Sequence, residues 1–379
     1  MRRTLQLACG VSLAAVLAAC GGGSGAIPDP KPQPVALTSD QIRMYSGHSL
    51  LAGLVVQAPS AALSVAALVY ILEQDQDADS FTAECPEGGS IEGGYQRSDS
   101  LGGVSKNDQV TATFHECSLR LGVLGLSLFD DNDDQVITLN GKATVLFTEN
   151  TDIPIPKVAP GPTKPSLAES LKSFMWAGPP PGMEEFLSAA TKVSYEQFQI
   201  GEVGDYTTFD GTVRVRGAIV DPTEYQKMEA PLGNDEEPYL TFSTSQNDGE
   251  SLTVSFDEDD KSYAQTFTQF RSMMRIGCEC DGLQHTISDL QYAAEGSDPE
   301  LGENFAYSVQ LEEPIVINES EFGSASGKML TTVDLGDDYT EEVTTEFASS
   351  DDNATVAISS TGGATWSGSF EEYLGFEFD

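Results

Sequence analysis

Positive charge is scarce in this sequence. Lys and Arg number 19 against 60 Asp and Glu, which gives a formal net charge of −41. A chain this acidic is repelled by nucleic-acid phosphates and by anionic lipid headgroups, so nucleic-acid binding and polybasic membrane contact are excluded. A cationic partner or divalent ions are compatible with the charge, but solubility and mutual repulsion at a crowded surface are the simpler explanation.

Histidine and catalytic motifs are also scarce. The histidines are His48, His115 and His285, and none lies in a His-Glu-x-x-His pattern. Gly323–Gly327 has the spacing of a nucleophile elbow but carries Ala325 at the nucleophile position. Carboxylates are so numerous that no acid–base pair stands out. We therefore expect no catalytic residue; a hydrolase is the least favoured alternative and requires His115 or His285 to meet a serine or a carboxylate in a cleft.

The amino terminus lacks an apolar run long enough to cross a bilayer. Leu5 to Ala19 gives about 15 apolar residues, where a transmembrane helix needs roughly 20. Arg2 and Arg3 precede this run, and small residues follow it. A basic start, a short apolar stretch and small residues at the end are typical of a secretory signal peptide, here residues 1–19.

The end of this signal, Leu17-Ala18-Ala19-Cys20, resembles the lipobox of bacterial lipoproteins. The resemblance implies that the signal is removed and that diacylglycerol is attached to the thiol of Cys20, the new first residue. Two or more acyl chains anchor a protein stably to a membrane. Gly21 follows, where an Asp usually retains proteobacterial lipoproteins at the inner membrane. The expected location is therefore the outer membrane.

Four cysteines remain after the signal and the lipidation site are set aside: Cys85, Cys117, Cys278 and Cys280. An even number in an oxidising compartment predicts disulfides, and four cysteines allow three pairings. We expect Cys85–Cys117, with Cys278 and Cys280 either paired to each other or one of them free. A redox or zinc role for Cys278 and Cys280 is disfavoured, because no Cys-x-x-Cys pair opens a helix and only His285 lies nearby.

Residues 20–38 are rich in Gly and then Pro, which predicts a flexible and then extended tether. Residues 39–79 look helical, and Ser49 to Leu72 carries no charge. Pro is favoured in the first turn of a helix, so we expect a buried helix that starts near Pro59 and ends near Glu73.

Residues 80–150 change to the two-residue period of strands. Val110, Ala112 and Phe114 alternate with polar residues. Asn140-Gly141 lies between two apolar runs, which is the strongest short hairpin signal because a type I′ turn needs positive φ at both central residues. Asp210-Gly211 and Asp248-Gly249 predict further hairpins.

The same region resembles a pattern of uncharacterised proteobacterial lipoproteins. The matching residues are Cys85-Pro86-Glu87-Gly88-Gly89, Phe114-His115-Glu116-Cys117 and Leu139-Asn140-Gly141. The pattern is a Cys-Pro-x-Gly-Gly start, a Phe-x-x-Cys strand end and a Leu-Asn-Gly hairpin. The family usually has a Gly-Asp turn before the second cysteine strand, where this chain has Asn107-Asp108. The resemblance implies no activity and no functional residue.

A proline-rich stretch interrupts the strands. Five prolines between 153 and 165 predict an extended linker. Ser166 to Trp176 has a capping box and an apolar face, which predicts a short helix, and a second helix is expected from Met183 to about Thr191. We expect residues 39–150 to form a helix-plus-β domain, 151–192 a linker with short helices, and 193–379 a second β domain.

Residues 193–379 are rich in short Thr/Val/Phe segments. Expected strands are Leu240–Thr244, Leu252–Phe256, Phe305–Leu311, Met329–Leu335, Val343–Phe347 and Thr355–Ile358. No helices of 12 residues alternate with them, which disfavours a parallel sheet. The predicted fold class is mainly β, an antiparallel meander, half-barrel or sandwich with a few short helices.

The best metal candidate is an acidic turn. Asp130, Asn132 and Asp134 match the first alternating oxygen ligands of a calcium loop. Gln135 and Gly141 then occupy the positions where that loop needs Gly and a bidentate Glu. A solvated acidic turn is the favoured interpretation, with Ca²⁺ binding as the alternative and no other cofactor expected.

Taken as a whole, the sequence favours a lipid-anchored, non-enzymatic envelope protein with a binding or structural role. Its body faces the periplasm or the cell surface, and its partner is a protein or an apolar small molecule. The alternative is a lipid or lipoprotein carrier or assembly factor, which requires an apolar concave sheet face left open by helices.

Overall fold

The computed structural model describes most of the chain from residue 36 onward. The described ranges are 36–73, 80–98, 104–120, 136–150, 188–202, 205–219, 240–258, 261–279, 282–298, 301–318, 324–336, 339–350 and 353–374. Val35–Asp379 form one compact unit. Among the described residues, no helix is both long enough and apolar enough to cross a membrane.

The described residues form one long helix, one short helix and 15 strands. The helices are α1 (Ser39–Glu73) and α4 (Phe370–Leu374). The strands are β1 (Ser80–Glu84), β2 (Ser90–Gln96), β3 (Gln109–Arg120), β4 (Val136–Phe147), β5 (Ser188–Glu202), β6 (Asp205–Ile219), β7 (Leu240–Ser245), β8 (Ser251–Glu258), β9 (Lys261–Glu279), β10 (Gly282–Asp298), β11 (Gly302–Asn318), β12 (Ser324–Gly336), β13 (Tyr339–Ser350), β14 (Asn353–Ser360) and β15 (Thr365–Ser369).

All the strands belong to one antiparallel sheet. Their order follows the sequence from β1 to β15, with β7 and β8 sharing one position between β6 and β9. A strand that pairs with its neighbour in sequence needs only a short connection, which is why consecutive Thr/Val/Phe segments fold into a meander. The expected mainly β, antiparallel class is confirmed, and each of the six strands expected after residue 240 lies within an observed strand.

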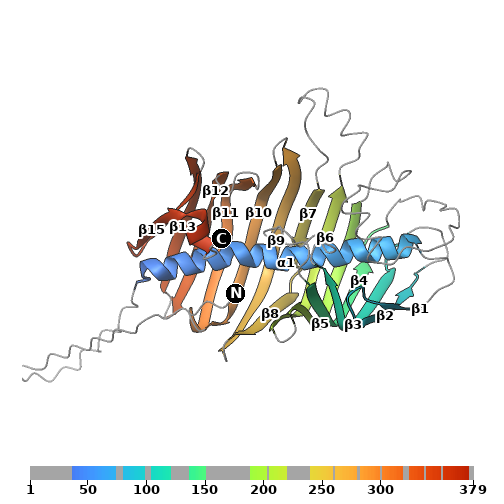
Figure 1. Cartoon of the computed structure of the whole chain (residues 1–379). Coiled ribbons are helices and arrows are strands. Elements are labelled where there is room, and N and C mark those ends of the chain that lie inside the picture. The colour runs from blue at the N-terminus through green and yellow to red at the C-terminus, as the bar shows by residue number, and fades with distance from the viewer. Residues whose placement is uncertain are drawn as a thin grey trace, which may run out of the picture. The chain divides into compact units, whose positions relative to one another are not determined.

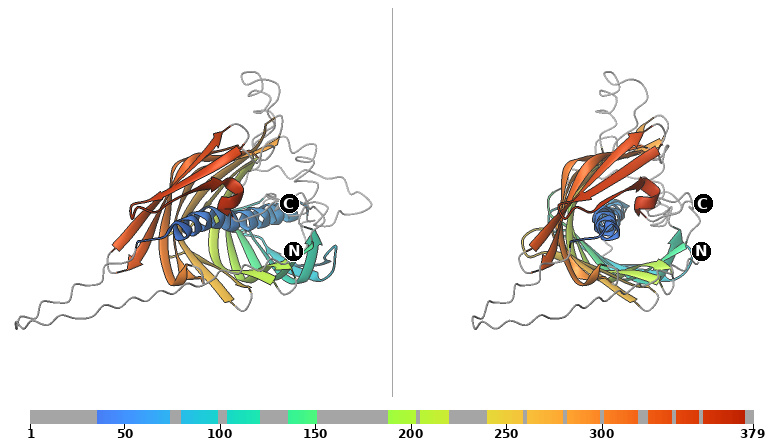
Figure 2. Two further views of the ribbon diagram at one scale, coloured as in Figure 1. Left: turned by 60° about the vertical axis from the view of Figure 1, so that its left-hand side comes forward. Right: turned by 90° about the vertical axis from the view of Figure 1, so that its left-hand side faces the viewer.

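Helix α1 lies across the strands in the hollow of the curved sheet (Figures 1 and 2). Its first turns contact β12–β15, and its later turns contact β7, β6, β5 and β4. The view along the helix axis shows the sheet curving around it (Figure 2, right). We call the face that α1 covers the concave face and the opposite one the outer face. The buried core lies between α1 and the concave face.

A line of β-bulges crosses the sheet from β3 to β12 and runs beside α1. The register shifts between β3 and β4, β4 and β5, β5 and β6, β9 and β10, β10 and β11, and β11 and β12. The residues with positive φ along this line include Glu116 in β3, Gln197 in β5 and Gln269 in β9. The interruption between β7 and β8 falls on the same line. Bulges bend strands and increase their twist. This bulge line therefore accounts for the curvature that makes room for the helix.

Two Asx-Gly pairs belong to the bulge line and not to hairpins, which corrects the sequence prediction. Asn140-Gly141 lies inside the continuous strand β4, and Asp210-Gly211 lies inside β6. The glycines do adopt positive φ, +80° and +127°. A Cβ at Gly141 would lie 1.9 Å from the carbonyl oxygen of Gln197. Glycine is therefore needed here because the backbone of β5 passes so close.

Asp248-Gly249 does lie in a turn, closed by the N–H of Glu250 bonding the carbonyl of Asn247. The flanking strands β7 and β8 do not pair with each other. Each pairs with β6 on one side and β9 on the other. The turn is therefore a break within one strand position, and the predicted hairpin is wrong.

Helix α1 starts 20 residues before the expected position, because Ser39 and not Pro59 opens it. Thr38 and Gln41 form the cap: the Gln41 N–H donates to Thr38 Oγ1 at 3.3 Å, and the Thr38 N–H donates to Gln41 Oε1 at 3.0 Å. Pro59 lies inside the helix. The bond that it forfeits would have reached the carbonyl of Val55, whose side chain is 40% exposed. The lost hydrogen bond therefore falls on the solvent-exposed side of the helix, and the side that packs against the sheet keeps its contacts.

The strands on the two sides of the proline-rich stretch are joined directly. β4 pairs with β5 from Phe147↔Thr191 to Thr138↔Gly201. Residues Ser188–Thr191 belong to β5, so the second expected helix is wrong at its carboxyl end. Alternate β5 side chains pack into the core, and this burial overrides their helical pattern. The rest of that helix and the helix expected at Ser166–Trp176 lie outside the described residues.

The disulfide Cys85–Cys117 is confirmed, with the two Cα atoms 5.4 Å apart. It joins the turn after β1 to β3. In that turn the Glu87 N–H bonds the Ser118 carbonyl, and the Ser118 N–H bonds the Gly88 carbonyl. The bridge and these bonds fix the first hairpin of the sheet on the third strand.

Candidate functional site

The contact between α1 and the concave face is the most elaborate polar arrangement among the described residues. Small or polar side chains recur on the sheet-facing side of the helix at three- and four-residue steps. They are Ser46, Ser49, Gly53, Gln57, Ser60 and Ser64. Each of the five polar ones is at most 6% exposed. This spacing follows one face of a 3.6-residue helix. We call these residues the polar stripe of α1.

The serines of the polar stripe join hydroxyl groups of the sheet to the helix backbone. The Ser60 hydroxyl donates to the Val56 carbonyl at 2.8 Å and lies 2.8 Å from the Tyr195 hydroxyl. Because its single proton is used within the helix, Tyr195 must be the donor in the second bond. Ser64 repeats the pattern with the Ser60 carbonyl and the Thr191 hydroxyl.

The first turns of α1 are held in the same way. Ser49 Oγ donates to the Tyr45 carbonyl at 2.6 Å and accepts from Thr331 Oγ1 at 3.0 Å. The Ser46 hydroxyl lies 2.5 Å from Thr345 Oγ1 and 2.8 Å from the Tyr373 hydroxyl. Buried neutral hydrogen bonds of this kind contribute about 1 kcal/mol each.

Gln57 occupies the middle of the stripe and uses both ends of its amide. Its Nε2 donates to the Phe242 carbonyl at 3.2 Å, and its Oε1 accepts from Ser272 Oγ at 3.2 Å. Gly53 lies one turn earlier, where a Cβ would come 3.0 Å from Leu290 Cδ1. The helix therefore approaches the sheet closely on both sides of Gln57.

Tyrosines of the concave face donate to the helix at every ordinary pH. Tyr292 donates to the Ser49 carbonyl at 2.6 Å. Burial is the largest cause that raises the pKa of Tyr195 and Tyr292 above the usual value. Their hydroxyls thus keep the proton that the helix requires. The arrangement binds an uncharged helix, and the chain's own α1 occupies it.

The outer face carries ion pairs as well as hydrogen bonds between neutral side chains such as Thr253 and Thr266. The pairs are Lys142–Glu196 at 2.7 Å, Lys192–Glu250 at 3.3 Å, Arg214–Glu250 at 2.9 Å, Arg271–Asp289 at 2.6 Å, Lys328–Glu312 at 3.2 Å, Lys328–Glu346 at 3.5 Å and Arg216–Glu149. Glu250 is the most buried partner, with 13% of its side chain exposed. Burial raises its pKa, but hydrogen bonds from Arg214, the Asn247 N–H and Lys192 outweigh this and lower it.

The three histidines lie far apart in the fold. His115 is half-exposed on β3, with Nε2 3.1 Å from Glu92 Oε1. His48 lies on α1, with Nδ1 3.7 Å from Asp298 Oδ2. His285 belongs to β10, opposite Ile276 and Ile317. No serine hydroxyl is recorded within hydrogen-bond distance of His115 in the described part of the chain, and its only recorded partner is the exposed Glu92.

Most of the other predicted site residues fall outside the described ranges. Asp130, Asn132 and Asp134, the calcium candidates, lie there, as do Cys20 and Cys280. Cys278 belongs to β9, opposite Leu283. Within the described residues, no group of three or more His, Cys, Asp or Glu side chains is arranged to hold a metal ion.

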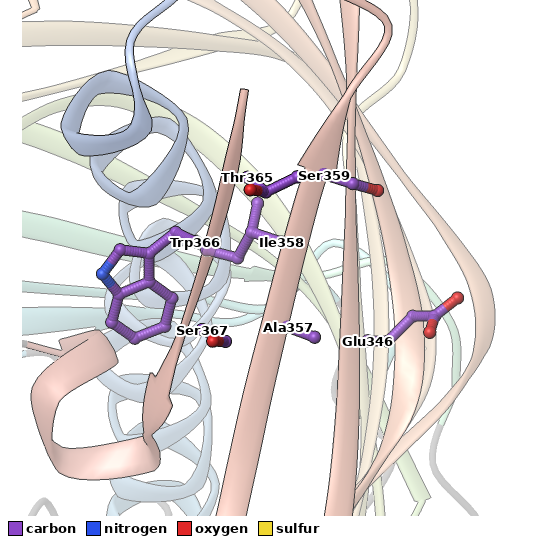
Figure 3. A pocket seen from close by; sticks show the side chains of 7 residues that line it. All are labelled: Glu346, Ala357, Ile358, Ser359, Thr365, Trp366 and Ser367. Atoms are coloured by element: carbon purple, nitrogen blue, oxygen red, sulfur yellow. The ribbon is translucent and has the colours of Figure 1, made fainter. Parts of the chain in front are cut away.

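Shallow pockets lie among the described residues, and three of them are formed as follows. One, of about 370 Å³, lies at β13–β15, where Trp366 and Ile358 lie on one side of the strands and Ala357 and Glu346 on the other (Figure 3). A second, of about 420 Å³, lies beside the start of α1 at Leu37 and Gln41. The third, of about 360 Å³, lies on β5, β6, β8 and β9.

Comparison with models of protein families, with curated proteins and with solved structures found no match to this chain. The site therefore has to be interpreted from its own geometry.

The polar stripe was missed by sequence reasoning, although a signal for it exists. Gln57, Ser60 and Ser64 interrupt the uncharged, largely apolar stretch from Ser49 to Leu72. Plotted at 100° per residue, they fall with Ser46, Ser49 and Gly53 on one side. Small polar residues on one side of an otherwise apolar helix indicate close packing against a hydroxyl-rich surface.

Proposed function

We propose that this chain is a lipid-anchored, non-enzymatic protein of the outer membrane whose β body binds a ligand or supports the envelope. Cys20 carries diacylglycerol, residues 20–38 form the tether, and the sheet with α1 forms the body. The observation that supports this proposal is a join between the predicted tether and the body, a contact that fixes the chain where the tether ends. The Leu37 N–H donates at 2.9 Å to Oε2 of Glu341, a carboxylate only 3% exposed, immediately before the cap at Thr38.

This join gives the tether a fixed end on the sheet. A buried carboxylate that accepts a backbone N–H is a directional contact, and it holds the chain where α1 begins. The helix starts directly after the predicted tether, at Ser39. A pull on the lipid anchor would therefore reach the body at β13 and at the first turn of α1.

The geometry gives less support to a carrier of apolar ligands. Such a carrier needs an open apolar concave face, and here α1 lies across that face and contacts β4–β7 and β12–β15 (Figure 1). A ligand would have to displace the helix and break the hydrogen bonds of Ser46, Ser49, Gln57, Ser60 and Ser64. Each broken bond leaves buried polar groups unpaired, at about 1–3 kcal/mol apiece.

Membrane fractionation of the full-length chain tests the anchor. The wild type is expected in the outer-membrane fraction, released only by detergent, with an amino-terminal peptide whose mass includes diacylglyceryl-Cys20. Cys20→Ser should move the protein to the soluble fraction. Cys9→Ser is the matched control, because Cys9 is removed with the signal, and it should leave the location unchanged. A Cys20→Ser variant that stays in the membrane fraction would contradict the proposal.

A further inference from the structure

The third shallow pocket lies on the outer face, where three polar side chains and one alanine from four strands lie in register. Gln199 in β5 lies opposite Thr208 in β6, which lies opposite Ser255 in β8, which lies opposite Ala264 in β9. Their neighbours Phe209 and Val254 are buried, so the alternation of a strand points these four side chains away from α1.

A second row beside the first contains the aromatic ring and the carboxylate. Tyr206 lies opposite Gly201, and Asp257 lies opposite Ser262. Gly201 has no side chain and Ala264 has only a methyl group, so the surface is hollowed between Tyr206 and the polar row. The resulting pocket of about 360 Å³ is lined by all of these side chains except that of Gly201. This volume is at the lower end of the range for small-molecule sites, about 300–1,000 Å³.

The hydrogen-bonding groups of this pocket are pre-arranged. Gln199 Nε2 donates to Thr208 Oγ1 at 3.3 Å, which leaves its Oε1 as an acceptor. Ser262 Oγ donates to Asp257 Oδ1 at 2.5 Å. Among the described residues, no hydrogen bond to Asp257 Oδ2 is recorded. A ligand therefore meets carboxylate and amide acceptors beside an aromatic ring.

An aromatic pair whose residues also line the pocket joins the strand ends that carry Asp257 and Ser262. Phe256 and Tyr263 lie directly opposite each other, with ring centroids 4.4 Å apart and planes 7° from parallel. Cross-strand aromatic pairs stabilise a hairpin. This pair fixes the register of β8 and β9 at the pocket, so the polar groups need little ordering when a ligand binds.

We propose that this pocket binds an uncharged saccharide. Sugar hydroxyls supply donors for the carboxylate of Asp257 and the amide oxygen of Gln199, and the C–H face of a sugar ring packs on the ring of Tyr206. No basic side chain is among the residues that line the pocket, so an anionic ligand would meet Asp257 without compensation. The inference rests on the binding role proposed above and names the ligand class for it.

Calorimetric titration tests the inference on residues 21–379, which include the whole compact unit Val35–Asp379. The probes are chitotriose, cellotriose and, as an anionic counterpart, trigalacturonate. At least one neutral trisaccharide should bind with a Kd on the order of 0.1–1 mM, and trigalacturonate should bind at least about tenfold more weakly. Preference for chitotriose would indicate an N-acetylated cell-wall glycan, and preference for cellotriose a plain glucan; either supports the inference.

Two variants and one control locate the binding. Tyr206→Ala should remove the stacking surface, and Asp257→Asn should remove the charged acceptor without changing shape; each should weaken binding at least about tenfold. Tyr339→Ala removes a tyrosine that is 43% exposed on another hairpin and should change Kd by less than about twofold. Melting temperatures identify any variant that fails to fold. If Tyr206→Ala does not fold, the affinity of the conservative variant Asp257→Asn tests the inference.

Absence of binding by both neutral sugars at about 10 mM, a concentration well above the expected Kd, overturns the inference. So does wild-type affinity in the folded Asp257→Asn variant, or tighter binding of trigalacturonate. Lipidation of Cys20 is measured separately, by fractionation. A chain that is membrane-anchored but binds no sugar therefore contradicts the saccharide inference and leaves the proposed anchor intact.

Discussion

The two faces of the sheet hold their polar side chains in different ways. On the concave face, neutral hydroxyls and one amide bond α1 in full burial, as at Ser60 and Gln57. On the outer face, ion pairs such as Lys142–Glu196 are open to solvent, with 38% and 63% of the two side chains exposed. Solvent-exposed ion pairs are worth about 0–1 kcal/mol, whereas breaking a buried neutral bond costs about 1–3 kcal/mol. The contacts of the concave face therefore contribute more to the free energy of unfolding, and the outer face remains available for a ligand.

The largest expected loss of stability comes from a substitution in the bulge line, which curves the sheet and so makes one of its faces concave. Gly141→Ala places a Cβ 1.9 Å from the Gln197 carbonyl oxygen at φ +80°, so β4 and β5 must separate. We expect a loss of at least about 3 kcal/mol in unfolding free energy, measured by urea denaturation.

Gly249→Ala is the matched control for this change. Gly249 has nearly the same φ, +81°, and also follows an acidic or amide residue, but nothing lies within 4 Å of the added Cβ. It should lose only about 1 kcal/mol, the cost of the left-handed conformation. Equal losses in the two variants would show that φ alone matters and that the close approach of β5 does not.

The next effect tests the concave face itself. Gln57→Ala removes both amide bonds, leaves the Phe242 carbonyl and the Ser272 hydroxyl without this partner, and opens a cavity under α1. The expected loss is about 2–4 kcal/mol in urea denaturation.

Val55→Ala is the control on the other side of the same helix. Val55 is 40% exposed, so the substitution should cost less than about 1 kcal/mol. If Val55→Ala proved as damaging as Gln57→Ala, the helix would depend on its open side, and the assignment of stability to the polar stripe would be wrong.

The smallest expected loss of stability concerns Glu250 on the outer face, and it depends on pH. Burial alone would raise the pKa of Glu250, but Arg214, the Asn247 N–H and Lys192 lower it below its ordinary value. The stabilising contribution is thus present above the unfolded pKa and is lost as pH falls through the folded one. Glu250→Gln should cost about 1 kcal/mol at pH 7 and converge with wild type only once the pH lies below the lowered pKa of folded Glu250.

Glu149→Gln serves as the comparison, since Glu149 and its partner Arg216 are both more than half exposed. Its cost should stay under about 0.5 kcal/mol at both pH values. Thermal melts at pH 7 and at low pH measure both variants. A Glu250→Gln deficit that persists undiminished in acid would show that packing, and not charge, stabilises this position.

The sequence predicts the repetitive part of this fold well. Strands with alternating burial, such as β13 and β14, follow directly from the two-residue period, and the Cys85–Cys117 bridge was among the pairings expected from the even number of cysteines. Local sequence patterns predict less where contacts between residues distant in the sequence determine the structure. Asn140-Gly141 correctly marks positive φ, but a bulge needs positive φ as much as a hairpin does.

The start of α1 was missed for a related reason. Pro59 is typical of a first helical turn, yet contacts far away in sequence, such as Ser46 with Thr345 and Ser49 with Thr331, stabilise the turns before it. Such contacts are invisible in a local window. The saccharide pocket combines β5, β6, β8 and β9, so only the register of the sheet brings Gln199, Tyr206 and Asp257 together.

Hydrogen-exchange mass spectrometry of residues 21–379, with and without a saturating concentration of whichever neutral trisaccharide binds more tightly, tests the division between the faces most directly. Without sugar, peptides from α1 should be among the most protected, since the polar stripe is buried along its length. With sugar, peptides covering 199–208 and 255–264 should gain protection while α1 stays unchanged. Loss of protection in α1 on addition of the sugar, with no change at 199–208, would show that ligands enter the concave face and would contradict the account.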